Sequence, residues 1–135
     1  MEGTKKRILV VDDEPNLVLL VEARLKASGY EVLSASDGLT ALEMAKREKP
    51  DLIILDLMLP KMDGFKVCGL LKKDFRYKKI PILLFTARAQ DTDRQMGIEA
   101  GAEAYITKPF EPEKLLSKIK ELIGNNTATH EGGVQ

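Results

Sequence analysis

Residues 8–13 read Ile8-Leu9-Val10-Val11-Asp12-Asp13, four apolar residues followed directly by two carboxylates. Two later segments follow the same plan, a short apolar run and then polar residues: Leu52-Ile53-Ile54-Leu55 and Ile82-Leu83-Leu84-Phe85. Short apolar runs without alternation are typical of strands that are buried on both faces of a parallel sheet. The sequence therefore predicts three central strands at these places.

Two further segments, 31–35 and 104–107, have a more polar composition that favours edge strands. Helical patterns separate and follow the strands, over residues 15–28, 39–49, 64–74, 91–101 and 112–123. Five strand–helix units in succession predict an α/β protein, because right-handed crossovers place helices on both faces of a parallel sheet. We expect a five-stranded parallel sheet in the flavodoxin-like (βα)5 order 2-1-3-4-5.

The composition is that of an ordinary globular domain. The 135 residues are 44% hydrophobic and 31% charged, and 21 basic residues balance 21 acidic ones. A neutral chain has no overall field to draw it to nucleic acid or to an anionic membrane, so we expect neither as a partner of this domain. We expect one domain over residues 1–123, followed by a flexible tail or the start of a linker over 124–135, which holds the single histidine, His130.

Localisation is predicted from what the chain lacks. Its one cysteine, Cys68, excludes an internal disulfide framework, and we expect this residue in the core. Residues 1–7 are polar and do not resemble a signal peptide, and no apolar run is long enough to span a bilayer. These features predict a cytoplasmic protein.

Polar residues that follow the predicted strands suggest a functional site. Asp12 and Asp13 follow the first strand, Asp56 the third, Thr86 the fourth and Lys108 the fifth. Parallel strands end at one edge of the sheet, where ligands bind in such folds, so we expect these groups to converge. Carboxylates held close together repel one another unless a cation joins them. An all-oxygen site without nearby Cys or His favours Mg²⁺ over Zn²⁺.

The other two groups suit phosphate chemistry. Lys108 supplies a point charge for a phosphoryl oxygen, and the Thr86 hydroxyl can donate a hydrogen bond to another. A carboxylate can act as the nucleophile and form an aspartyl phosphate. We predict Asp56 as the acceptor, because it ends the central apolar strand between the acidic pair and the lysine.

The sequence resembles the receiver domains of two-component response regulators, including the chemotaxis regulators. The resemblance covers about residues 6–123 and rests on Ile8-Leu9-Val10-Val11-Asp12-Asp13-Glu14-Pro15, Asp56-Leu57-Met58-Leu59-Pro60, Asp63-Gly64, Thr86-Ala87 and Lys108-Pro109-Phe110. It implies a signalling switch rather than a turnover enzyme. A histidine kinase, a phosphotransfer protein or a small phosphodonor would phosphorylate Asp56 in a Mg²⁺-dependent reaction, and the domain would also dephosphorylate itself.

The resemblance also implies a role for each site residue. Asp13, Asp56 and the backbone carbonyl of Met58 would coordinate Mg²⁺ directly, while Asp12 acts largely through water. Thr86 and Lys108 would bind phosphoryl oxygens, with a cis peptide bond between Lys108 and Pro109. Tyr105 would be the switch aromatic that moves inward with Thr86. Met58 and Arg88 would tune the lifetime of the phosphoryl group.

In this family the responding face comprises the fourth helix, the fifth strand and the fifth helix, which implies a downstream protein target or a homodimer. Other functions stay open: a receiver-like interaction module that is never phosphorylated, a small Mg²⁺-dependent phosphohydrolase and, least supported, a flavin mononucleotide carrier. The sequence also leaves open whether the chain acts alone or is a fragment of a longer regulator.

One basic cluster lies outside the predicted site. Between the third helix and the fourth strand the chain carries Lys72, Lys73, Arg76, Lys78 and Lys79. We expect a solvated loop there rather than a nucleic-acid contact.

Overall fold

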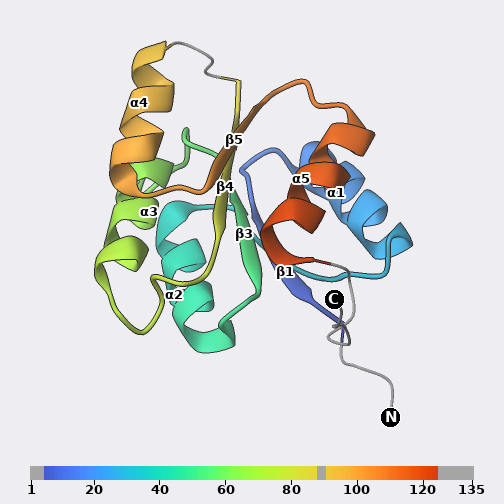
Figure 1. Cartoon of the computed structure of the whole chain (residues 1–135), viewed down its shortest axis with the longest axis horizontal. Coiled ribbons are helices and arrows are strands. Elements are labelled where there is room, and N and C mark those ends of the chain that lie inside the picture. The colour runs from blue at the N-terminus through green and yellow to red at the C-terminus, as the bar shows by residue number, and fades with distance from the viewer. Residues whose placement is uncertain (1–4, 88–90, 125–135) are drawn as a thin grey trace.

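The computed structural model describes residues 5–87 and 91–124. Strands and helices alternate along the whole described chain (Figure 1). The elements are β1 (Arg7–Val11), α1 (Pro15–Ala27), β2 (Glu31–Ala35), α2 (Gly38–Glu48), β3 (Leu52–Leu55), α3 (Gly64–Lys73), β4 (Ile82–Thr86), α4 (Asp91–Ala100), β5 (Ala104–Thr107) and α5 (Pro112–Ile123). Every predicted strand and helix is present, with bounds that differ from the predictions by one or two residues at most.

The five strands form one parallel sheet in the order β2-β1-β3-β4-β5. Helices α2, α3 and α4 cover one face, and α1 and α5 cover the other (Figure 1). The predicted fold class, strand order and two-sided helix arrangement are therefore confirmed.

Alternate residues of the central strands feed two separate cores, which explains why their sequences are continuously apolar. Leu9 and Ile53 pack under α2 and α3, whereas Ile8, Val10 and Ile54 pack under α1 and α5. All residues of β3 and β4 are buried, while β5 is only half-buried throughout. The predicted distinction between central and edge strands is confirmed.

The start of α2 packs tightly on the loop after β3. Asp37 caps the helix by accepting a hydrogen bond from the Thr40 amide at 2.7 Å. The next residue, Gly38, lies so close to the backbone of Met62 that an added Cβ would be 1.7 Å from the Met62 carbonyl oxygen. Only glycine fits there, so this contact fixes the β3–α3 loop, which follows Asp56.

The prediction that the basic cluster is solvated is wrong for Lys72, the first residue of that cluster. Lys72 lies in the last turn of α3 with a side chain that is only 11% exposed. Its ammonium donates to the carbonyl oxygens of Lys78 and Ile80 at 2.9 and 2.8 Å, and to Glu103 at 2.7 Å. These acceptors satisfy all three donors of a half-buried charge, so Lys72 is a structural residue.

Cys68 is fully buried on α3, as predicted, with its sulfur 3.5 Å from the Ala100 carbonyl oxygen. Burial raises the pKa of the Cys68 thiol to about 11, since the thiolate loses its hydration.

We expect Cys68 to resist iodoacetamide in the folded protein at pH 8, because the thiolate is the reactive form and both burial and the raised pKa suppress it. The same reagent in denaturant should label one site. Intact mass spectrometry over time checks this, and rapid labelling of the native protein would contradict it.

Within the described residues no helix has the length and apolar character needed to cross a bilayer. His130, Arg88 and most of the expected tail lie outside those residues, so predictions that concern them are not tested.

Candidate functional site

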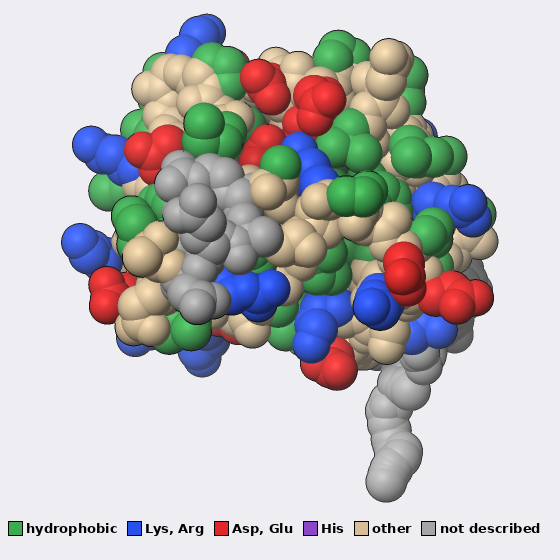
Figure 2. All heavy atoms as spheres, turned by 90° about the horizontal axis from the view of Figure 1, so that it is seen from above, with side chains coloured by type: hydrophobic (Ala, Val, Ile, Leu, Met, Phe, Trp, Pro, Cys, Tyr) green, Lys and Arg blue, Asp and Glu red, His purple; other side chains and the backbone are tan. Residues whose placement is uncertain are grey.

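Three carboxylates meet at the carboxyl edge of the sheet. Val11 and Leu55 are register partners, so Asp12 and Asp56 leave neighbouring strands at the same level. One carboxylate oxygen each from Asp12, Asp13 and Asp56 lies within 4.8 Å of the others. Figure 2 views the molecule from this side and shows acidic side chains gathered beside a basic one. The predicted convergence is therefore present.

The backbone holds the two buried carboxylates in place. The Asp12 amide donates to the Ala35 carbonyl at 3.1 Å, and the Asp56 amide donates to the Val11 carbonyl at 3.0 Å. Asp12 Oδ1 accepts from the Glu14 amide at 3.0 Å, while Asp56 Oδ1 accepts from the Met58 amide at 3.3 Å. Each side chain thus uses one oxygen to order its own loop and keeps the other, Oδ2, for the site.

Lys108 supplies the positive charge. It follows β5, and its ammonium lies 2.6 Å from Asp12 Oδ2 and 3.1 Å from Asp56 Oδ2. A third acid, Glu14, is 3.5 Å away, and the Phe85 ring centroid lies 5.4 Å from the ammonium. Sequence reasoning gave Glu14 and Phe85 no role, although Glu14 extends the acidic run at 12–13 and could have been noticed.

Burial and charge oppose each other in this cluster. Burial raises the pKa of Asp12 more than its hydrogen bond with Lys108 lowers it, and the nearby Asp56 charge raises it further. Burial alone would lower the pKa of Lys108, but the hydrogen bond to Asp12 and the charges of Asp56 and Asp12 outweigh this and raise it. One ammonium therefore faces several carboxylates, an excess of negative charge that favours a further cation.

The donor set fits Mg²⁺. All three candidate side-chain ligands are carboxylates, and Mg²⁺ is held in proteins by one or two carboxylates together with water. Asp12 and Asp56 are buried, being 2% and 4% exposed, whereas Asp13 is exposed. A site with one exposed ligand has the access to solvent that a partly hydrated ion needs.

The remaining predicted residues lie around this cluster. Thr86 is fully buried at the end of β4, and its carbonyl accepts a hydrogen bond from the Lys108 amide at 2.8 Å. The Lys108–Pro109 peptide bond is cis, as expected. Met58, whose amide donates to Asp56, is 58% exposed. Tyr105 lies further off in β5, where the Arg94 guanidinium is 4.9 Å from its ring centroid.

Gly64 brings α3 against the backbone of the acceptor loop. Its amide donates to the Leu57 carbonyl at 2.9 Å, and an added Cβ would lie 2.2 Å from the Asp56 carbonyl oxygen. The preceding Asp63 caps α3 by accepting from the Lys66 amide at 2.9 Å. Asp63-Gly64 therefore sets the position of Asp56, a role that its sequence alone does not reveal.

Comparison with known proteins assigns the family. A sequence model of the response regulator receiver domain matches residues 8–120. The chain belongs to the response regulator receiver family. It is 48% identical over 120 residues to the alkaline phosphatase synthesis transcriptional regulatory protein PhoP of Bacillus subtilis, covering 87% of this chain and 48% of that protein. It is 45% identical over 117 residues to the DNA-binding dual master transcriptional regulator RpaA of Synechocystis, covering 87% and 48%.

Solved receiver structures share the fold of this domain. A putative response regulator from Chloroflexus aurantiacus has a TM-score of 0.86 and 34% identity, with 90% of this chain and 100% of that chain covered. The receiver domain of a sensor histidine kinase from Pseudomonas aeruginosa, solved with a magnesium ion coordinated in its active site cleft, has a TM-score of 0.83 and 32% identity, with 90% and 100% covered.

The chain is thus a response regulator receiver domain of a two-component system, a phosphorylation-dependent signalling switch rather than a conventional enzyme. Receiver domains are phosphorylated on aspartate by histidine kinases and bind Mg²⁺ in an acidic site, and the acidic cluster of this chain is consistent with that. The chain spans about half the length of the curated relatives it matches.

Proposed function

We propose that this receiver domain accepts a phosphoryl group on Asp56, with Lys108 as the charge partner of the product. The observation that carries the proposal is the meeting of Asp12, Asp13 and Asp56 around one ammonium at the carboxyl edge of the sheet. Asp56 is the acceptor because it is buried at the centre of the cluster, between the ammonium and the Met58 amide.

In the proposed reaction an oxygen of Asp56 attacks phosphorus, and the bond between phosphorus and the donor breaks. The imidazole of a phosphohistidine, or the carboxylate of an acyl phosphate, leaves with the electron pair. In the unphosphorylated structure the Lys108 ammonium forms an ion pair with Asp56 Oδ2. After phosphorylation it would bind a phosphoryl oxygen, and the Thr86 hydroxyl would bind another. Attack of water on phosphorus would then break the bond to the Asp56 oxygen, return the free carboxylate and release inorganic phosphate.

Asp13, Asp56 and the Met58 carbonyl would hold Mg²⁺, with Asp12 acting through water. When bound, the ion neutralises charge on the reacting oxygens, a task that carboxylate-held Mg²⁺ performs in other phosphoryl-transfer sites. Asp12, whose raised pKa reflects its burial, already shares Lys108 with Asp56, so a second cation would relieve the repulsion between their carboxylates.

The proposal extends to the output and the limits of the domain. Tyr105 and Thr86 would form the switch, and the α4, β5 and α5 face would contact a protein target or a second copy.

Residues 1–123 would form the folded unit and 124–135 a tail or linker. The donor would be a histidine kinase or phosphotransfer protein in the cytoplasm, with no nucleic-acid contact by this domain, although the relatives named above are transcriptional regulators.

Mg²⁺ binding by Asp13→Asn tests the metal site. We expect calorimetry to show one Mg²⁺ bound by the unmodified protein and an affinity lower by about tenfold or more in the variant, because a charged ligand is lost. Asp51→Asn is the matched control: Asp51 accepts from the Arg7 amide at the opposite edge of the sheet, and asparagine can keep that bond. Equal Mg²⁺ affinity in both variants would refute the metal assignment.

A further inference from the structure

The ammonium of Lys108 lies over the ring of Phe85, the last apolar residue of β4. The distance from the ammonium nitrogen to the ring centroid is 5.4 Å. A cation within about 6 Å of an aromatic ring is attracted electrostatically by the ring face, which is negative. The same ammonium donates to Asp12 and Asp56, so the ring lies against the charge that serves the phosphorylation site.

Both groups of this contact are shielded from water. Phe85 is 1% exposed, and the side chain of Lys108 is 13% exposed. The attraction between a cation and a ring is stronger at such desolvated positions than at exposed ones. The ring of Phe85 therefore contributes to where the Lys108 ammonium lies.

The Phe85 ring is held in place by the fold. It belongs to the core under α1 and α5, and its backbone is the register partner of Ile106, two residues before Lys108. The Phe110 ring, two residues after Lys108, meets it at a centroid distance of 5.3 Å and an interplanar angle of 81°. This edge-to-face arrangement is a favoured geometry of aromatic pairs. The ring therefore offers Lys108 a fixed face.

The carboxylates alone do not hold the ammonium inside the site. Lysine carries its charge on a flexible four-carbon chain, so the charge can follow any nearby acid. Glu14 lies 3.5 Å from the ammonium and its side chain is 67% exposed, so it attracts the charge toward solvent. The Phe85 ring attracts the same charge from the core and opposes this displacement.

We propose that Phe85 is a positioning residue for phosphoryl transfer, whose ring holds the Lys108 ammonium inside the site, where a phosphoryl oxygen on Asp56 would meet it. The inference rests on the proposed function of Asp56. A benzene ring has no group that binds phosphate, so Phe85 acts only through Lys108. An aliphatic residue of similar size would fill the same core without a negative face, so a purely structural role predicts different results.

Fluorinated phenylalanines at position 85 test this role. Each fluorine draws electrons from the ring and weakens its attraction for a cation, with little change in size. We expect the rate of Mg²⁺-dependent phosphoryl uptake from acetyl phosphate, followed by intact mass, to fall stepwise over the mono-, di- and trifluorinated proteins. The fall should reach about threefold with the trifluorinated ring.

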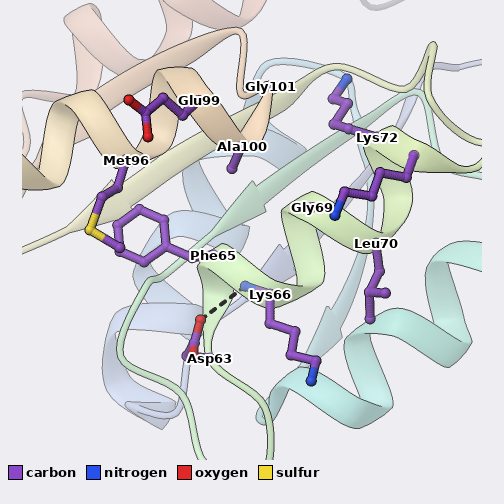
Figure 3. A pocket seen from close by; sticks show the side chains of 11 residues that line it. Asp63, Phe65, Lys66, Gly69, Leu70, Lys72, Met96, Glu99, Ala100 and Gly101 are labelled. Carbon is purple, nitrogen blue, oxygen red and sulfur yellow. Dashed lines mark hydrogen bonds between the residues drawn. The ribbon is translucent and has the colours of Figure 1, made fainter.

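Phe65 provides the matched control. Figure 3 shows its ring beside the Met96 side chain, between α3 and α4. It packs against the core on the other face of the sheet from Phe85. The same fluorinated residues at position 65 should leave the rate of uptake unchanged, because the ring that faces Lys108 is untouched. An equal fall at both positions, or no fall at position 85, would overturn the proposal.

Urea unfolding gives a second readout that needs no phosphorylation. Four proteins combine phenylalanine or its trifluorinated form at position 85 with Lys108 or with Lys108→Met. Fluorination should lower the urea midpoint more with lysine than with methionine, since the ring attracts only the ammonium. The same change in both backgrounds would remove the contact and with it the proposal. If the unmodified protein takes up no phosphoryl group while the midpoints differ as expected, the acceptor assignment fails and the role of Phe85 in phosphoryl transfer fails with it, although the contact stands.

Discussion

Asp56→Asn is expected to abolish the uptake of a phosphoryl group from acetyl phosphate. The unmodified protein should gain one phosphoryl group in the presence of Mg²⁺ and none after chelation. Asparagine keeps the size of the side chain and can still accept from the Met58 amide, which donates to Asp56 Oδ1 at 3.3 Å. It lacks the anionic oxygen that attacks phosphorus, so the loss should be complete. Intact mass spectrometry measures the gain directly.

Asp51→Asn again serves as the control, since it changes the same functional group at the far edge of the sheet. It should take up one phosphoryl group as the unmodified protein does. Mg²⁺-dependent uptake by Asp56→Asn at an unchanged level would place the acceptor elsewhere. Absence of uptake in a folded, Mg²⁺-binding unmodified protein would instead favour an acceptor that only a kinase can use, or an interaction module that is never phosphorylated.

Gly64→Ala is expected to lower the free energy of unfolding by about 2 kcal/mol, because overpacking of a tight contact forces the backbone to move. The new Cβ would lie 2.2 Å from the Asp56 carbonyl oxygen and 2.8 Å from the Leu57 Cα, both of which are backbone atoms. Because the displaced backbone carries Asp56, the rate of phosphoryl uptake should fall as well. Urea denaturation followed by circular dichroism gives the stability, and a time course of intact mass gives the rate.

Gly69→Ala provides a matched control on the same helix. Its Cβ meets nothing within 4 Å, and alanine is favoured over glycine inside a helix by about 1 kcal/mol. We therefore expect this variant to be more stable than the unmodified protein, with an unchanged rate of phosphoryl uptake. The interpretation of Gly64 fails if the two variants unfold at the same urea concentration.

The two variants separate roles that the sequence presents as equal, since both positions are glycines of one helix. At Gly64 the α3 N-terminus meets the loop after β3, and this long-range approach makes glycine necessary. At Gly69 the helix faces solvent, and glycine is only one of several residues that would fit.

The sequence by itself determined the fold class, the strand order and the residues that gather at the site. Short apolar runs such as 52–55 could be assigned because a strand buried on both faces needs apolar residues at every position. The convergence of Asp12 and Asp56 followed from parallel strands that end at one edge. Both inferences use local sequence patterns together with a sheet topology that has few alternatives.

Only the tertiary structure decided how neighbouring residues with the same chemistry differ. Asp12 is buried and bonded to Lys108, whereas the adjacent Asp13 is exposed. Lys72 is half-buried and hydrogen-bonded to three acceptors, whereas Lys73 is exposed. The state of each charge depends on partners far along the chain, because burying a charge is tolerated only where such partners surround it. Those partners are set by packing, which local sequence patterns do not describe.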